Sequence, residues 1–316
     1  MREIKKKILV VGSLNMDLVV STPSIPLPGQ NVFGSGFEMI PGGKGANQAI
    51  AVARLSKNCE STMGGRVGVD YFGSTLIKVL DDNHVNTEYI ERDSSNVTGI
   101  ALIMVTPDGE NRIIIASGSN QKFSTESANR LKKAISAADL VLMQLELPVD
   151  SITEVIEIAI SLNKTVVLDA GPPCRTPKPS FFKVTALTPN REEAEAMSGK
   201  KIKDVEDGFK VAHYFLEKGV KTVVIKLGKE GAILATANID KYFPGHKVKV
   251  VDATGAGDAF SAALAIAMVE GKDYVEAVEF ANAAGALAVT KLGAQPSMPT
   301  RNEVEEFLGM LAKANR

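Results

Sequence analysis

A glycine-rich turn flanked by two aspartates is the part of this sequence best suited to chemistry. The residues "DATGAGDAF" place Asp252 and Asp258 around Gly255 and Gly257, directly before an apolar run that predicts a buried helix. Glycine lets backbone amides approach another group closely, and amides at a helix start attract negative charge. Such a turn could stabilise the charge on a transferring phosphoryl group while Asp258 takes a proton from an attacking hydroxyl.

The position of Asp258 has a second interpretation. Aspartate at the start of a helix is a common N-cap, so these residues alone leave cap and base both open. A charge at the end of a buried helix is costly when its role is only structural, which favours the catalytic interpretation. If Asp258 is a base, we expect the helix start to lower its pKa and keep it ionised.

A second glycine-rich stretch, "PGGKGAN", also precedes a predicted helix. Gly42, Gly43 and Gly45 surround Lys44, and Asn47 falls on the first turn. Amides at such a helix start favour an anion or a polyhydroxylated ligand, and Asn47 is free to hydrogen-bond hydroxyls. A tight loop that needs positive φ would explain the glycines but not Lys44 and Asn47.

Other common site types are not indicated by the sequence. No GxxxxGK[ST] motif occurs, and no GxGxxG follows a strand. His84, His213 and His246 are scattered, so a zinc site or a histidine-based triad is not expected. Cys59 and Cys174 form no CxxC pair, which fits free thiols in a reducing cytoplasm.

The composition excludes several classes of protein. The 316 residues include 36 Lys and Arg against 37 Asp and Glu, and both signs are interspersed along the chain. Nucleic-acid and membrane-surface proteins normally show a basic face or tail, so neither partner is expected. The longest apolar run, residues 259–269, is too short to span a bilayer, and "ILVVG" near the N-terminus is too short for a signal peptide. We therefore expect a cytoplasmic protein.

The elements that must position these residues follow from an alternating pattern. Short runs rich in Val, Ile and Leu predict strands covered on both faces, and they are "KILVVGS", "DLVLMQLE", "KTVVLDAG", "VTALTPN" and "KTVVIKLG". Helical patterns separate them at 124–139, 150–163 and 205–219, with Ser124, Asp150 and Gly219 as cap candidates. This alternation predicts a doubly wound, mostly parallel sheet flanked by helices. Ligands bind beyond the carboxyl ends of such strands, where this sequence collects polar residues.

Two stretches, residues 17–43 and 98–118, break the alternation. The first carries four prolines, and the second reads as two strands around the turn Pro107-Asp108-Gly109. Together they predict a small antiparallel sheet, with a strand of the main sheet as the alternative. Residues 100–105 are all apolar, so we expect both faces to be covered, one over a substrate and one against a second subunit. The predicted division is an α/β core of residues 1–14, 43–96 and 119–316 and a β-sheet lid of residues 15–42 and 97–118.

The whole chain resembles the PfkB family of carbohydrate kinases. The resemblance is carried in order by "GSLNMDLVV", "PGGKGANQAIAVARL", "QLELP", "TPNREEAE", "KLGKEGA", "DATGAGDAFSAALA" and "LGAQPSMP". It implies the ribokinase-like fold and the ATP-dependent phosphorylation of D-ribose at O5. It also implies Mg²⁺ with ATP, K⁺ as an activating ion and a homodimer formed through the lids. The alternatives are another sugar kinase of the family (a deoxyribokinase, fructokinase or 2-keto-3-deoxygluconate kinase) and a non-catalytic sugar-binding protein on the same fold.

The resemblance also assigns roles to individual residues. It implies a sugar pocket, with Asp17 bidentate to a vicinal diol, formed by Asn15, Asp17, Gly43, Lys44, Asn47 and Glu146. Asp258 would be the base, and Gly255, Ala256 and Gly257 the anion hole. Nucleotide contacts would come from Asn190, Lys226, Gly228, Gly231, Gly257 and Asn282, with Glu193 positioning Mg²⁺ through water. A K⁺ site would be formed by Asp252, Thr254, Ala288, Lys291, Gly293 and Ser297, several through backbone carbonyls. Lys226 stands where other members often have Thr or Ser, which leaves open whether a side chain contacts phosphate there.

Overall fold

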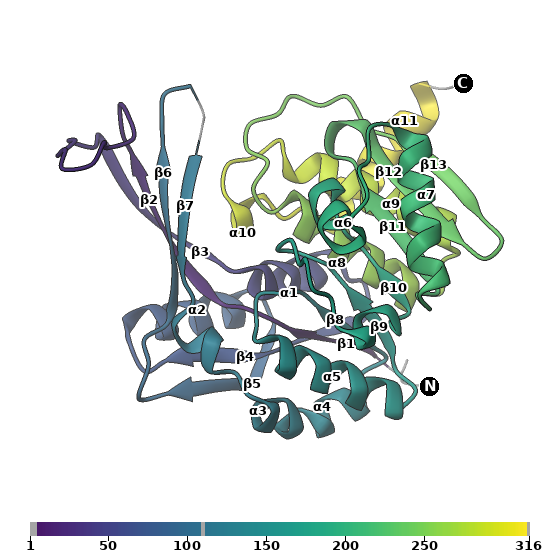
Figure 1. Cartoon of the computed structure of the whole chain (residues 1–316), viewed down its shortest axis with the longest axis horizontal. Helices are drawn as coiled ribbons and strands as arrows, with labels where there is room; N and C mark the ends of the chain where they lie inside the picture. Colours follow the sequence, from purple (N-terminus) through teal and green to yellow (C-terminus); the bar gives the residue numbers. More distant parts are fainter. Residues whose placement is uncertain (1–4, 109–110, 315–316) are drawn as a thin grey trace.

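Two separate sheets organise the chain, which the computed structural model describes over residues 5–108 and 111–314 (Figure 1). The larger sheet has nine strands in the order β13-β12-β11-β10-β9-β8-β1-β4-β5. Their bounds are β1 Lys6–Val11, β4 Cys59–Gly68, β5 Asn86–Asp93, β8 Leu140–Met143, β9 Thr165–Leu168, β10 Ala186–Leu187, β11 Thr222–Lys226, β12 Gly231–Thr236 and β13 Asp240–Pro244. The pairs from β11 to β5 are parallel, and β12 and β13 add an antiparallel edge. The predicted mostly parallel sheet is confirmed.

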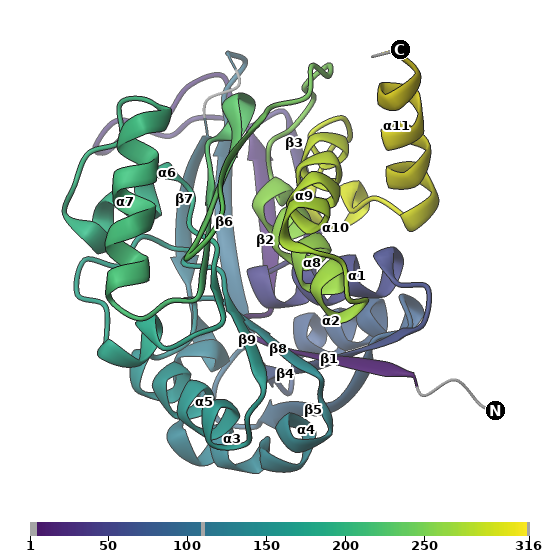
Figure 2. The same ribbon diagram turned by 90° about the vertical axis from the view of Figure 1, so that its right-hand side faces the viewer.

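Helices cover both faces of this sheet, as Figure 2 shows. One layer consists of α1 Lys44–Leu55, α2 Tyr71–Asp82, α8 Ala256–Val269, α9 Tyr274–Ala288 and α11 Arg301–Ala314. The other consists of α3 Thr125–Arg130, α4 Lys132–Ala137, α5 Val149–Ser161, α6 Arg191–Ser198 and α7 Val205–Glu217. Side chains alternate across a strand, so Ile8 and Val10 of β1 enter the first core while Leu9 and Val11 enter the second. This is why residues 8–11 of β1 are all apolar.

The four strands of the second sheet lie in the order β3-β2-β6-β7 and extend away from the main sheet (Figure 1). They are β2 Asn15–Ser21, β3 Gly36–Gly42, β6 Gly99–Val105 and β7 Asn111–Ala116. The alternative of a main-sheet strand is wrong. The expectation of an antiparallel sheet holds for two pairings, but β2 and β6 are parallel. Both strands leave the main sheet outward, after β1 and after β5, so they run side by side in one direction. Gly109 of the predicted turn lies outside the described residues.

The two faces of the second sheet differ in what they carry. The strand register places Asp17 in one row with Ile40, Ala101 and Ile115. The neighbouring row on the opposite face contains Met39, Leu18, Leu102 and Ile114. Met39, Leu102 and Ile114 are exposed, as is Phe37 on the same face. Within one chain this apolar face is uncovered, so its expected cover by a second subunit stays a prediction.

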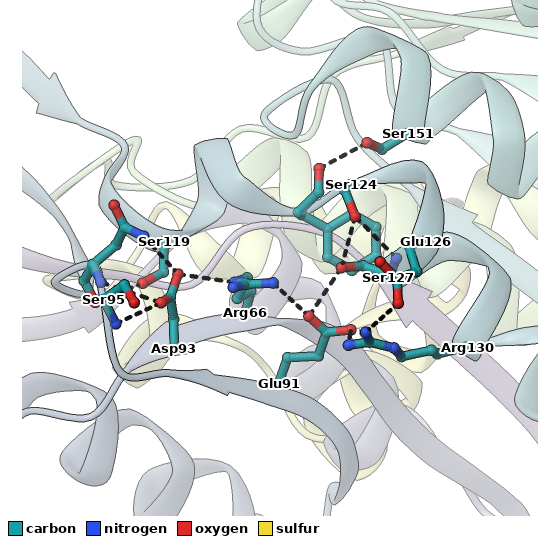
Figure 3. Close-up of polar contacts among 12 residues, drawn as sticks. Arg66, Glu91, Asp93, Ser95, Ser119, Ser124, Glu126, Ser127, Arg130 and Ser151 are labelled. Carbon is teal, nitrogen blue, oxygen red and sulfur yellow. Dashed lines mark hydrogen bonds and ion pairs between the residues drawn. The ribbon is translucent and has the colours of Figure 1, made fainter.

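A polar cluster fixes the segment where the chain leaves the main sheet for β6. Figure 3 shows Arg66 of β4 between two acids of β5, with Nε 3.0 Å from Asp93 and Nη1 2.7 Å from Glu91. Asp93 in turn accepts hydrogen bonds from the backbone amides of Ser95 and Asn96. Ser119, in the short helix η1 (Gly118–Lys122), donates to the carbonyls of residues 96 and 97. The base of the second sheet is thus tied to the strands below it.

Two local expectations need correction. The pattern at 124–139 forms two short helices, α3 and α4, that meet at Leu131. Ser124 is the N-cap of α3, but α5 begins after Pro148, so Asp150 lies in its first turn and does not cap it. In the part of the chain that the structure describes, every helix is too short or too polar to cross a bilayer.

Candidate active site

The starts of α1 and α8 meet the carboxyl ends of the parallel strands, as the polar strand ends predict. Asn47 of α1 donates to Asp258 of α8, with Nδ2 2.9 Å from Oδ2. The two glycine-rich stretches, 211 residues apart in sequence, therefore form one site. Both side chains are buried.

Glycine at position 43 lets α1 begin directly against β2. Gly43 is the N-cap of α1 with φ 90°, a conformation that other residues rarely adopt. A Cβ there would lie 2.6 Å from the backbone nitrogen of Asn15, and one at Gly42 would collide with the Asp17 carboxylate. The loop geometry thus explains these glycines, while Lys44 and Asn47 are left for the site itself.

A pocket of about 340 Å³ lies beside the start of β2. Its lining includes Asn15 and Glu146 of the predicted sugar site, together with Asn120 and Ile115, but not Asp17 or Lys44. Asn120 donates to the side-chain oxygen of Asn15 at 2.8 Å, which leaves the Asn15 NH₂ group as a donor. The volume is within the range of small-molecule pockets.

Two carboxylates of the predicted sugar site, Asp17 and Glu146, are poorly solvated. Burial raises the pKa of Asp17 to about 7, followed by the negative charges of Glu146 and Asp258. Burial likewise raises the pKa of Glu146, which hydrogen-bonds Ser13 and lies 3.4 Å from the backbone nitrogen of Lys44. A raised pKa means that the protonated Asp17 stabilises the fold below about pH 4 and that this stability is lost as the pH rises through about 7. A ligand that hydrogen-bonds the ionised group offsets this cost.

The direction of the Asp258 pKa shift was predicted wrongly from the sequence. We expected the helix start to lower its pKa, but burial raises the pKa of Asp258, while Lys44 and the amides of Asn47 and Gln48 lower it. Loss of water outweighs the helix start because the side chain is almost fully enclosed. Conversely, the negative charge of Asp258, more than that of any other group, raises the pKa of the Lys44 ammonium.

The turn before Asp258 contains the three residues that are predicted to form an anion hole. Gly255 is the N-cap of α8 with φ 79°, and no side chain caps the helix, so cap and base are not competing roles for Asp258. A Cβ at Gly255 would lie 2.7 Å from Cε of Met298. The Ala256 amide donates to the carbonyl of Ala253 at 3.3 Å, so Ala256 and its neighbours lie in a tightly packed turn.

A buried ion pair borders this turn. Lys226, at the end of β11, lies 2.6 Å from Asp169, which follows β9, and both are at most 9% exposed. The Lys226 Nζ would be 3.5 Å from a Cβ at Gly257, so the ammonium group faces the candidate anion hole. Asp169, Gln48 and Gln144 were not singled out from the sequence, although Asp169 and Gln144 lie in the predicted strand runs "KTVVLDAG" and "DLVLMQLE".

Asn190 and Glu193 form a capping box at the start of α6. Asn190 Oδ1 accepts from the Glu193 amide at 2.9 Å, and Glu193 Oε2 accepts from the Asn190 amide at 2.7 Å. Glu193 is buried and therefore no solvated helix residue. Burial, with help from the charge of Asp169, raises its pKa, and Lys226 opposes this shift. Its other oxygen, Oε1, faces Gly171.

The remaining predicted nucleotide residues lie around the end of β11. Gly228 opens the short helix η3 (Gly228–Glu230), and Gly231 begins β12. Asn282 of α9 donates to the carbonyl of Pro244 at 2.9 Å. That contact joins α9 to the end of β13.

The predicted potassium residues form a loop packed against the anion hole. Asp252 accepts from the backbone and side chain of Thr254 at 2.9 and 2.7 Å and from the Gly293 amide at 2.9 Å. Ser297, in α10 (Ala294–Ser297), donates to the carbonyl of Ala294. The carbonyl of Ala288 receives only a long contact, 3.4 Å from the Lys291 nitrogen, and the Lys291 side chain pairs with Glu303.

Comparisons with known proteins find similar proteins over nearly the whole chain. The family described as pfkB family carbohydrate kinase matches residues 5–301. Ribokinase from Haemophilus influenzae is 36% identical over 304 residues, covering 96% of this chain and 99% of the relative. The crystal structure of ribokinase from Thermotoga maritima has a TM-score of 0.87 and 38% identity, covering 97% and 100% of the two chains. Arabidopsis thaliana ribokinase complexed with ribose and ATP has a TM-score of 0.88 and 32% identity, covering 97% and 99%.

Proposed function

The chain belongs to the pfkB family of carbohydrate kinases, and on that basis we propose that it transfers the γ-phosphoryl group of ATP to O5 of D-ribose. The observation that supports this most directly is the hydrogen bond between Asn47 and Asp258, because it joins the sugar-side and phosphate-side helix starts. The products are D-ribose 5-phosphate and ADP.

In the proposed mechanism Asp258 is the general base. It takes the proton of the primary hydroxyl while O5 attacks the γ-phosphorus in line, and the bond to the ADP oxygen breaks. The amides of residues 255–257 and the Lys226 ammonium offset charge on the transferring group. Ribose is held by Asp17, Asn15 and Glu146, with Gly43, Lys44 and Asn47 completing the pocket. The lid excludes water, which protects ATP from hydrolysis.

The nucleotide side is proposed on the same basis. Asn190, Lys226, Gly228 and Gly231 border the phosphates, and Asn282 borders the base. Glu193 fits Mg²⁺ bound through water, because its buried carboxylate keeps one oxygen outside the capping box and lies near the charge of Asp169. When bound with ATP, Mg²⁺ offsets phosphate charge.

A monovalent cation site is proposed at the loop beside the anion hole. Asp252, Thr254, Ala288, Lys291, Gly293 and Ser297 offer one carboxylate and otherwise hydroxyl or carbonyl oxygens, which suit K⁺. The under-used carbonyl of Ala288 supports this fit. Bound K⁺ supplies a fixed positive charge that stiffens the loop. We also place the protein in the cytoplasm, which its two free cysteines support.

A sugar panel assayed with ATP, with and without K⁺, tests the function. We expect ribose to be the best substrate and 2-deoxyribose to be turned over less efficiently, because it lacks one hydroxyl partner of Asp17. We expect K⁺ to raise the turnover of ribose. Equal kcat/KM for the two sugars would favour a deoxyribokinase, and ATP consumption that does not respond to any sugar would favour a binding protein.

We further propose a homodimer formed by the second sheet. The face opposite Asp17 exposes Phe37, Met39, Leu102 and Ile114, and contiguous apolar area of this kind marks an interface. Sedimentation at micromolar concentration should show a dimer, and Ile114→Glu should give a monomer. Met310→Glu, at an exposed apolar residue on α11, is the matched control and should leave the dimer intact. A wild-type monomer would remove this proposal.

A further inference from the structure

We propose that Gln48 is a positioning residue that holds the Asp258 carboxylate by donating from one amide group to two buried acids. Gln48 Nε2 lies 3.0 Å from Asp258 Oδ1 and 2.8 Å from Asp169 Oδ2. Gln48 lies on the second turn of α1, and its side chain has no exposed surface. The inference rests on the proposed role of Asp258 as the base.

The orientation of the Gln48 amide is fixed by its partners. Gln144, directly after β8, donates from Nε2 to Gln48 Oε1 at 2.6 Å. In the flipped orientation, the Gln48 oxygen would face two carboxylates and its NH₂ group would face the NH₂ group of Gln144. Only the observed orientation satisfies all three contacts, so both N–H groups of Gln48 are committed to Asp258 and Asp169.

One donor on each oxygen fixes the plane of the Asp258 carboxylate. Asn47 donates to Oδ2 at 2.9 Å and Gln48 to Oδ1 at 3.0 Å. Rotation of the carboxylate would break both bonds. A general base works only when it is held within reach of the proton that it takes, and a fully buried amide can do this without touching the reactants.

Lys226 compensates the negative charge of Asp169, the second acid that Gln48 contacts. Asp169 accepts from Gln48 on one oxygen and from Lys226 on the other. The lysine charge therefore compensates Asp169, and the single Gln48 amide can bridge two acids in a dry site. Without Lys226, the buried Asp169 carboxylate would have no positive partner.

The charges that face Asp258 set the expected pH response. They are Lys44 on α1, Asp17 on β2, Glu146 after β8 and Asp169 after β9, with Lys226 paired to Asp169. An amide that donates to a carboxylate favours its ionised form. Loss of the Gln48 donor should therefore raise the pKa of Asp258, whereas a merely structural role for Gln48 would leave it unchanged.

The test is the pH dependence of kcat with ribose and ATP. In Gln48→Met we expect the acid limb to move up by about one pH unit, which corresponds to one lost hydrogen bond, with little change in the KM for ribose. Gln48→Glu keeps the side-chain shape and places an acid against two others. The acid limb of its kcat profile should also move to higher pH, which keeps the test valid if the Met variant folds poorly. Gln144→Met is the matched control, because it removes a contact to Gln48 but leaves both donors in place.

The possible outcomes separate this inference from the proposed function. An acid limb at the wild-type pH in both Gln48 variants would show that Gln48 only fills space. If Gln48 acts through the base, adding Gln48→Met to Asp258→Asn should not lower kcat further. Near-normal turnover of Asp258→Asn alone would instead overturn the base, whatever the Gln48 variants do.

Discussion

Replacing Asp258 with asparagine should lower kcat by about 10³-fold or more while ribose still binds. Asparagine has the same shape but cannot take the hydroxyl proton, and general-base catalysis contributes about 10² to 10⁴. Removal of a buried negative charge should not unfold the protein, because that charge is itself costly in a dry site. Steady-state kinetics gives kcat, and calorimetric titration with ribose gives binding.

The control for this variant is another aspartate at a helix start. Asp273 is the N-cap of α9 and accepts from the Glu276 amide at 2.8 Å. Asparagine caps helices as well as aspartate does, so Asp273→Asn should leave both stability and kcat nearly unchanged. If Asp258→Asn behaved like Asp273→Asn, Asp258 would be no base.

Lys226→Met should have the second large effect, and it acts on stability as well as turnover. It leaves Asp169 without its buried partner, which should lower the free energy of unfolding by about 3 kcal/mol. In the double variant Asp169→Asn/Lys226→Met both charges are gone and Gln48 still has an acceptor, so most of the stability should return. Denaturant unfolding measures both changes.

Turnover distinguishes the two possible roles of Lys226. If its ammonium offsets phosphate charge beside Gly257, kcat should stay roughly 10²-fold low in the double variant although stability has returned. Recovery of kcat together with stability would make Lys226 a structural residue only. Lys6→Met, which breaks the exposed pair with Asp139, is the control and should cost under about 1 kcal/mol.

The strands at the centre of the main sheet could be predicted because burial on both faces makes their sequences rich in Val, Ile and Leu. All five apolar runs form neighbouring strands, β1, β8, β9, β10 and β11, in the main sheet. The strands β4 and β5 escaped notice because glycines and charges interrupt them. The parallel pairing of β2 and β6 depends on where the chain leaves the main sheet twice, which no local pattern encodes.

The site was predictable residue by residue only where a glycine-rich motif marked it. The pairing of Asp169 with Lys226 depends on the spatial order β9-β10-β11, which the sequence does not state. Gln48 was missed because only its neighbour Asn47 was assigned to the glycine-rich motif. The direction of the pKa shift of Asp258 depends on how completely the fold encloses it. Helix start and burial act in opposite directions there, and the sequence gives the first but not the extent of the second.

The alternation along β2 has a mechanical consequence. Asp17 and Leu18 are adjacent in β2, so their side chains lie on opposite faces of the second sheet. A tilt that seats Asp17 against a sugar must move Leu18, Leu102 and Met39 by a similar amount. If these side chains contact a second subunit, sugar binding in one copy shifts the sheet surface that contacts the other copy. The sugar sites of the two copies should then be coupled through the two sheets alone.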